Sequence, residues 1–419
     1  MISTVLLKDK ENLIIFLFLY TSLIFGFYID ENLNFGAAGD WLHSEKSIIE
    51  AFSQDISKAL LNYESFGHRH SPTYLIFLSL LSKIGFSLDL IRFFHLNLSI
   101  LLIYFFFKCL AFKFENIDKK ILLFLSLSLF LSPTFRSLSI WPSTRMIGLI
   151  FFIISIYEFL KYQKFKKEIY IFKNLSFLIL SSYVSPNFSI FVIYFFYHYF
   201  KNEKFVFLIK HSIFCLILSL PAFYYIFVLD INFFTAYTPG SEQGEIIGLS
   251  FNFSNKILII SSIILFHLLP FLFYKSFFLD LKNIDKKFIL IFLIIFFICL
   301  FNFDYVIEYT GGGVFFQISN YLFGSNYFFY LISLISVIIL CFFSKNNLNN
   351  FLIFFILIIS NIQNTIYHKY YDPLILIIFF TIISSHLNHN FLKKRENIFY
   401  IYFFYLIFIC MRLLKNYIV

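Results

Sequence analysis

The sequence has few of the residues that build disulfide frameworks or metal clusters. Only five cysteines occur among 419 residues, and each stands alone in an apolar segment. Disulfide-rich domains and cysteine metal sites need cysteines in closely spaced sets. The sequence therefore predicts neither.

Apolar residues, in contrast, are abundant. They make up 60% of the chain, aromatic residues make up 23%, and the mean hydropathy is +0.81. Soluble domains contain roughly 45 to 50% apolar residues. Apolar runs of about 17 to 25 residues recur along the whole length, and such runs form helices in lipid because no water satisfies the backbone. The sequence predicts an all-α, polytopic transmembrane bundle that forms a single integral-membrane domain over residues 1–419.

The formal charge of +9 does not indicate a nucleic-acid partner. The lysines cluster in short loops rather than along one face, which is the pattern of the positive-inside rule. The predicted cytoplasmic loops are Lys161–Lys167, Lys201–Lys210, Lys282–Lys287 and Lys393–Arg395, and the predicted outer loops are 30–71, 134–145, 183–188, 230–256, 304–325 and 361–372.

Two segments decide the number of spans. Residues 11–29 lack a small-residue cleavage site and open a multi-span chain, so they are expected to form the first transmembrane helix rather than a signal peptide. Residues 72–120 form either two short spans or one true span with an interfacial or re-entrant piece. The second reading keeps Lys113, Lys119 and Lys120 inside and gives roughly 13 spans in total.

Residue types that are scarce in this chain gather on the predicted outer side. Trp41 and Trp141 are the only tryptophans, and both fall in outer loops. Three of the six arginines do so too, namely Arg69, Arg136 and Arg145. Tryptophan and proline also favour membrane interfaces and helix ends on their own account. Taken together, these residues nevertheless indicate a polar site on the outer face.

The first outer loop, residues 30–71, holds the candidate acids. Asp30 and Glu31 lie at the outer end of the first helix. Asp40 follows Gly36-Ala37-Ala38-Gly39, a small-residue stretch that is expected to turn tightly and to bring the carboxylate near the membrane surface. Next to Trp41 and His43, Asp40 is expected to be partly desolvated, which suits a general base. Each acid could also be an ordinary solvated loop residue.

Three basic segments are candidates for binding a phosphate. His68-Arg69-His70 concentrates positive charge where the next helix enters lipid, and arginine presents forked donors to phosphate. Arg136 and Arg145 share a short outer loop, and charges so near hydrocarbon usually face a cavity. The third segment contributes His368, Lys369 and Tyr370. The alternative for each is an interfacial anchor or an aromatic belt with a snorkelling lysine.

In layout the chain resembles the polytopic C-type (GT-C) glycosyltransferases, including the protein O-mannosyltransferases and the aminoarabinose transferases of lipid A. The residues that carry the resemblance are the acidic first outer loop, His68-Arg69-His70-Ser71-Pro72, the region of Arg92, the Ser-Pro start at Ser132 and Lys369-Tyr370-Tyr371-Asp372-Pro373. The chain departs from the family in having His70-Ser71-Pro72 where relatives have His-Pro-Pro or Lys-Pro-Pro.

The resemblance implies a catalytic acid in the first outer loop, either Asp40 or the pair Asp30 and Glu31. It also implies a polyprenyl-phosphate sugar donor, a hydroxyl on a glycan, lipid or protein as acceptor, no cofactor or metal, and a multi-pass location in the cell inner membrane. His43, His68, Arg69, His70, Arg136, Arg145, His368, Lys369 and Tyr370 would then bind substrate.

Two other classes remain as alternatives. A multi-span transporter or flippase should carry its ionisable residues in mid-span and often has internal repeats, whereas most acids and arginines here lie at span ends and no repeat is visible. A polysaccharide polymerase or ligase of the cell envelope normally depends on a large late outer loop, and the outer loops 230–256 and 304–325 are moderate in size.

Overall fold

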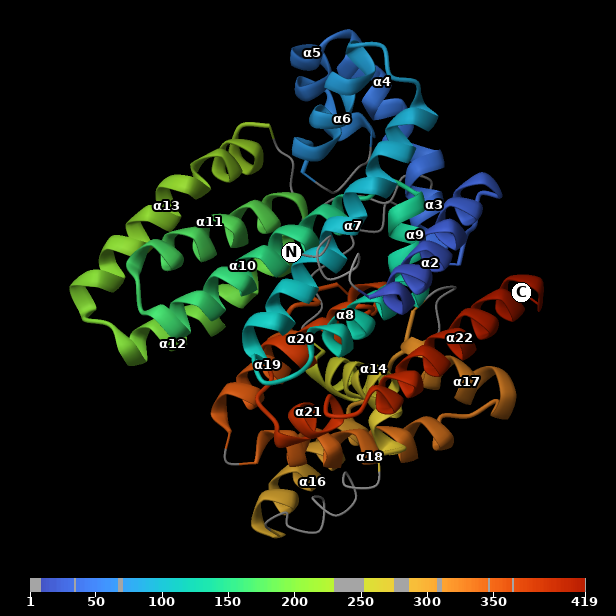
Figure 1. Ribbon diagram of the computed structural model, residues 1–419, viewed down its shortest axis with the longest axis vertical. Helices are drawn as coiled ribbons and strands as arrows, with labels where there is room; N and C mark the ends of the chain where they lie inside the picture. The colour runs from blue at the N-terminus through green and yellow to red at the C-terminus, as the bar shows by residue number, and fades with distance from the viewer. Residues whose placement is uncertain are drawn as a thin grey trace. The chain divides into compact units, whose positions relative to one another are not determined.

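The computed structural model is helical throughout the residues that it describes (Figure 1). The described residues are 9–33, 35–66, 71–229, 252–274, 286–306, 311–345, 347–363 and 365–418. Within these ranges the chain forms two compact units, one of residues 1–248 with 408–419 and one of residues 249–407. The all-α prediction is confirmed.

The first unit is built around long apolar helices with short helices between them. Its elements are α2 (Lys10–Tyr28), α3 (Phe35–Asp40), the π-helix η1 (Trp41–Glu45), α4 (Lys46–Gln54), α5 (Ile56–Leu61), η2 (Tyr63–Phe66), α6 (Thr73–Lys83), α7 (Leu88–Lys113), α8 (Lys119–Leu127), η3 (Ser128–Leu131), α9 (Pro133–Ile140), α10 (Thr144–Phe165), α11 (Glu168–Val184), η4 (Pro186–Phe191), α12 (Val192–Asn202) and α13 (Phe205–Phe227).

The second unit contains the later helices. They are α14 (Phe253–Leu272), α16 (Lys286–Phe301), α17 (Gly313–Phe323), α18 (Tyr327–Ser344), α19 (Leu348–Ile359), η5 (His368–Tyr370), α20 (Leu374–Thr381), α21 (His386–Phe391) and α22 (Arg395–Ile418), whose last part groups with the first unit.

Among the described residues, seven helices are long and apolar enough to cross a membrane, and the chain is therefore a multi-pass membrane protein by length and composition. An eighth span results if Lys119–Leu131 and Pro133–Ile140, which meet at 68°, count as one broken helix. The expected number of roughly 13 is not confirmed. Several apolar runs form helices too short to span: α6 has 11 residues, or about 16 Å, against a hydrocarbon core of about 30 Å.

The alternatives for residues 72–120 are distinguished by helix length. The structure has the short helix α6 followed by α7, which at 26 residues is a candidate span. This matches one true span preceded by a shorter apolar piece. Ser87 starts α7 by accepting a hydrogen bond from the backbone N–H of Leu90, which satisfies one of the donors at the helix N-terminus.

The described residues between 30 and 71, which the sequence analysis assigned to the first outer loop, are mostly helical. In α4, Ile48, Ile49 and Phe52 are buried while Lys46 and Glu50 are exposed, so the helix is amphipathic and packs one face inward. Gly36-Ala37-Ala38-Gly39 lies within α3, and the expected tight turn is therefore wrong. Alanine is the strongest helix former, and Ala37 and Ala38 are buried.

Candidate functional site

Asp30 and Glu31 are positioned by the way α2 ends. Asp30 has a left-handed backbone with φ of 52°, its N–H donates to the carbonyl of Phe27, and the N–H of Glu31 donates to the carbonyl of Gly26. These two bonds form a Schellman motif, which closes a helix and turns the chain sharply. Aspartate tolerates the left-handed region better than most residues. The turn directs two adjacent carboxylates to different partners.

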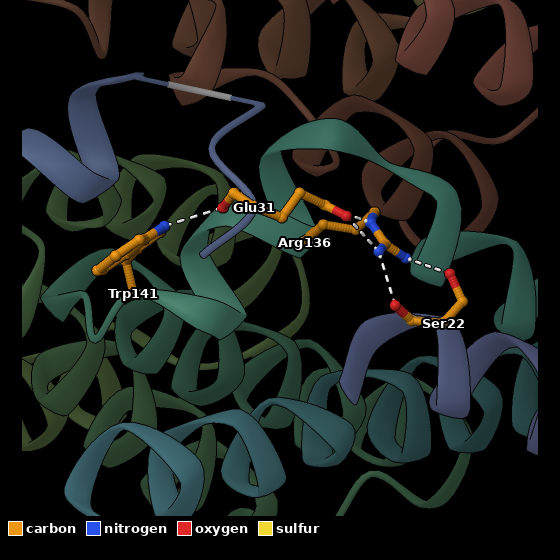
Figure 2. Close-up of polar contacts among 4 residues, drawn as sticks. All are labelled: Ser22, Glu31, Arg136 and Trp141. Atoms are coloured by element: carbon orange, nitrogen blue, oxygen red, sulfur yellow. Dashed lines mark hydrogen bonds and ion pairs between the residues drawn. The ribbon is translucent and has the colours of Figure 1, made fainter. Parts of the chain in front are cut away.

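The carboxylate of Glu31 forms a bidentate ion pair with Arg136 on α9 (Figure 2). Arg136 Nε and Nη2 each lie 2.6 Å from a carboxylate oxygen of Glu31. Nη1 donates to the hydroxyl of Ser22 and Nη2 also donates to its carbonyl, at 3.1 and 3.0 Å. Four of the five guanidinium N–H donors are thus engaged. The two charged side chains are only 5% and 15% exposed, so this pair is buried between α2 and α9.

Gly26 is required where this ion pair lies against α2. A Cβ atom on Gly26 would lie 2.7 Å from Glu31 Oε2 and 3.0 Å from Arg136 Nη2. Any larger residue would push the carboxylate away from the guanidinium.

The carboxylate of Asp30 pairs instead with Arg92 on α7. Arg92 Nη2 lies 2.7 Å from Asp30 Oδ1, and Nη1 lies 3.5 Å from Asp89 Oδ1. The guanidinium carbon of Arg92 lies 4.0 Å from the ring centroid of Trp141 and 5.0 Å from that of Phe27. Arginine stacks well on aromatic rings because its guanidinium is planar and weakly hydrated. Arg92 is therefore fixed, while the side chain of Asp30 remains 62% exposed.

Trp141 connects the two ion pairs. Its indole Nε1 donates to the backbone carbonyl of Glu31 at 3.0 Å, as Figure 2 shows, while its ring lies against Arg92. Trp141 directly follows α9, which begins at Pro133 and is capped by the Ser132 hydroxyl accepting from the N–H of Phe135. Proline at the first helical position and serine as the cap favour a helix start there. The sequence therefore places Arg136 on this short helix and Trp141 directly after it.

The sequence analysis missed a buried polar chain that reaches the same helix. Nε2 of His95 lies 2.7 Å from the carbonyl oxygen of Leu138 in α9, and Nδ1 lies 2.5 Å from the hydroxyl of Tyr74 in α6. A carbonyl only accepts, so Nε2 carries the hydrogen and Nδ1 of the neutral ring accepts from Tyr74. Burial raises the pKa of Tyr74, and the carboxylate of Glu45 raises it further. A histidine in an otherwise apolar run was the available signal.

The other predicted acid, Asp40, has a different environment. Asp40 and His43 are exposed, whereas Trp41 between them is 3% exposed. Protein side chains therefore do not bury Asp40, because the helix that carries it turns the tryptophan inward and the acid outward; its desolvation by the bilayer stays a prediction. The structure pairs Asp30 with Arg92 and Glu31 with Arg136, and it leaves Asp40 exposed.

The remaining predicted cations lie elsewhere. Arg145, 7% exposed, begins α10, with its guanidinium carbon 5.7 Å from the ring centroid of Phe188. In the second unit, His368 Nε2 lies 3.0 Å from Nε2 of His267, and Lys369 Nζ lies 5.3 Å from the ring centroid of Tyr367.

Tyr370 packs edge-on against Tyr367 in the same segment. His68, Arg69 and His70 lie outside the described residues.

Arg92 is the functional candidate that the sequence analysis left out of its list of site residues. The signal for it was available, because Arg92 follows Asp89 by three residues at the start of an apolar helix, and an ionisable residue so close to lipid usually has a partner. Its pairing with Asp30, 62 residues earlier, was not readable from spacing.

Metal ligation is not indicated by the part of the chain that the structure describes. Within it, no group of three or more His, Cys, Asp or Glu side chains is arranged to hold a metal ion. Comparison of the chain with protein-family models, with curated proteins and with solved structures finds no match.

Proposed function

We propose that this protein is a membrane glycosyltransferase of the cell inner membrane that moves a sugar from a polyprenyl-phosphate donor to a hydroxyl acceptor on the non-cytoplasmic face. The observation that carries the proposal is the arrangement at the end of α2. The carboxylate of Asp30 is accessible and is held by Arg92. The next residue, Glu31, is buried and forms a bidentate pair with Arg136.

The geometry favours Asp30 over Asp40 as the general base. The ion pair with Arg92 uses only Oδ1 of Asp30, which leaves Oδ2 to accept a proton, and the side chain is 62% exposed. A general base must reach the proton that it removes and must be held in place while doing so. Asp40 is exposed as well, but the geometry of an arginine held over a carboxylate is found at Asp30. Glu31, 15% exposed and paired through both oxygens, orients the end of the helix instead.

In the proposed reaction, Asp30 takes the proton from the acceptor hydroxyl as that oxygen attacks the anomeric carbon of the donor. The bond between the anomeric carbon and the phosphate oxygen breaks, the configuration inverts, and the bonding electrons leave with the polyprenyl phosphate. Preorganised cations stabilise such a leaving anion in a water-poor site. Arg145 is the buried candidate for this role in the first unit, and His43, His68, Arg69, His70, His368, Lys369 and Tyr370 are further candidates for substrate binding.

The decisive experiment measures sugar transfer from radiolabelled polyprenyl-phosphate sugars by purified protein in proteoliposomes. Asp30→Asn, Glu31→Gln and Asp40→Asn are compared with the wild type after membrane insertion has been checked. Removal of a general base typically lowers the rate by about 10²- to 10⁴-fold. We expect this loss for Asp30→Asn and near-normal transfer for Asp40→Asn. Loss in the Asp40 variant alone would move the base to Asp40. A wild type that transfers from no such donor would refute the proposed activity.

A further inference from the structure

A cavity of about 370 Å³ lies in the first unit between α11 and α13. Its walls include Leu175, Leu178 and Ile179 from α11 and Ala222 and Ile226 from α13. Small-molecule sites in proteins measure roughly 300 to 1,000 Å³, so the cavity is large enough to hold part of a ligand.

Three of the six hydroxyl groups along this cavity form hydrogen bonds within the protein, and the lining residues without a hydroxyl group are apolar. The hydroxyl of Tyr183 donates to the carbonyl of Leu218 on α13 at 2.6 Å, and that of Ser182 donates to the carbonyl of Leu178 at 2.8 Å. Ser71 lies 2.7 Å from the hydroxyl of Thr73. A sugar would need several polar partners to replace its bonds to water. The walls supply few, so the cavity suits a hydrocarbon chain.

The wall formed by α13 is an apolar helix that the rest of the protein covers little. α13 has 23 residues, and only 11% of its most apolar stretch is buried inside the protein. Leu216 and Leu220 are each 56% exposed and Phe227 is 77% exposed. An apolar helix that is long enough to span and so little covered by protein is expected to lie in lipid. A lipid chain can therefore reach the cavity from the bilayer.

The cavity and Arg145, the candidate for binding the phosphate, both contact the short helix η4. Pro186 and Ser189 of η4 line it, and Phe188 of the same short helix is the residue beneath the guanidinium of Arg145. α10 and η4 pack closely here, since a Cβ on Gly148 would lie 2.6 Å from the Cβ of Ser185. One wall of the cavity is thus fixed against the helix that carries Arg145.

We propose that the cavity between α11 and α13 binds the isoprenoid chain of the lipid-phosphate donor, with the phosphate directed toward Arg145. The inference rests on the proposed function, because it takes its ligand from it. The inference places the isoprenoid chain between α11 and α13. The acids at the end of α2 then have no part in binding that chain.

The test uses the full-length protein in phosphatidylcholine nanodiscs with a polyprenyl phosphate that carries a diazirine on its chain and no sugar. After irradiation, crosslinked peptides are mapped by mass spectrometry. Ala222→Trp fills the cavity, and Leu220→Trp is the matched control because Leu220 is an exposed residue of the same helix that does not line it. We expect crosslinks on α11 and α13 that Ala222→Trp abolishes, that Leu220→Trp retains and that unlabelled polyprenyl phosphate competes away.

Two results would overturn the inference. Crosslinks that unlabelled polyprenyl phosphate does not compete away would identify non-specific contact with the bilayer lipid, and crosslinks that Ala222→Trp leaves unchanged would place the isoprenoid chain elsewhere. The assay needs no transfer, so it is separate from the test of the activity. Specific crosslinking in the cavity without sugar transfer would refute only the proposed transferase activity. Sugar transfer without crosslinking in the cavity would refute only this binding site.

Discussion

Two acidic regions, ten residues apart in the chain, have opposite environments. At the end of α2, Asp30 and Glu31 each meet an arginine from a distant helix, and the arginines are 10% and 5% exposed. At the end of α3, Asp40 lies exposed beside the buried Trp41. Both regions combine an acid with a nearby tryptophan, so composition alone does not distinguish them. The difference arises because α7 and α9 bring cations to the first region.

A second contrast exists between the adjacent acids themselves. Glu31 accepts two hydrogen bonds from Arg136 and is buried, whereas Asp30 accepts one from Arg92 and is mostly exposed. Removing either member of the buried Glu31–Arg136 pair is expected to destabilise the fold, because the partner that remains is a buried, uncompensated charge. An exposed carboxylate held through one oxygen retains capacity for chemistry. The turn after α2 therefore divides structure and reactivity between neighbouring residues.

The largest effect on stability is expected from Arg136→Met. It leaves Glu31 as a buried unpaired carboxylate, and breaking a buried pair in this way costs about 3 to 5 kcal/mol. Thermal unfolding of the detergent-solubilised protein measures the loss. The double variant Arg136→Met with Glu31→Leu removes both charges and should regain most of it. The matched control is Lys164→Met, which breaks the exposed pair with Glu115 and should cost about 0 to 1 kcal/mol. Equal losses of stability in Arg136→Met and Lys164→Met would show that burial of the Glu31–Arg136 pair does not raise the cost of breaking it.

The next largest effect is expected from Gly26→Ala. The added methyl group meets the Glu31–Arg136 pair at 2.7 and 3.0 Å, and overpacking of this kind costs about 1 to 3 kcal/mol. Thermal unfolding again provides the measurement. Combining Gly26→Ala with Glu31→Asp withdraws the carboxylate by one methylene and should reduce the added cost of the alanine. A Gly26→Ala protein as stable as the wild type would show that the Glu31–Arg136 pair can accommodate a methyl group at this position of α2.

A smaller effect is expected from Arg92→Lys, which keeps the charge but removes the planar group between Trp141 and Phe27. The stacking contribution is about 1 to 2 kcal/mol for a partly desolvated site. In the transfer assay this variant should lose more activity than Asp40→Asn, because Asp30 loses its fixed partner. Arg92→Ala should lose at least as much stability and at least as much transfer activity as Arg92→Lys. Normal transfer by Arg92→Lys would show that charge alone is enough to hold Asp30.

Trp141→Phe separates the two contacts that Trp141 makes. Phenylalanine retains a ring for Arg92 but loses the indole N–H that donates to the carbonyl of Glu31, at a cost of about 1 kcal/mol. Thermal unfolding followed by circular dichroism avoids the change in tryptophan fluorescence. Trp141→Leu removes both contacts and is expected to be less stable than Trp141→Phe. If the two variants are equally stable, the ring contributes nothing to holding Arg92.

The smallest effect is expected from Asp40→Asn. Exposed substitutions usually change stability by no more than about 0.5 kcal/mol. Thermal unfolding should therefore give the same midpoint as the wild type, while His43→Gln on the same exposed segment serves as the matched control. A marked loss of stability in the Asp40 variant would mean that contacts of this exposed acid support the fold.

Several features followed from the sequence because they depend on local chemistry. The long apolar runs predicted a membrane helical protein, and the structure has seven such helices among its described residues. The start of α9 at Ser132 and Pro133 likewise agrees with the local preference for a serine cap followed by proline. The number of spans did not follow, because hydropathy does not say where a run is interrupted. The short helices α6 and α19 are cases where an apolar segment ends after 11 or 12 residues.

By itself the sequence determined the membrane class, the helical content and the residue types of the candidate site, since these follow from composition and from the need to satisfy the backbone in lipid. The tertiary structure decided which acids meet an arginine and how far each of these carboxylates stays exposed. Asp30 meets Arg92 across 62 residues and Glu31 meets Arg136 across 105. No periodicity encodes such distances, because partners so far apart are chosen by the packing of α2 against α7 and α9.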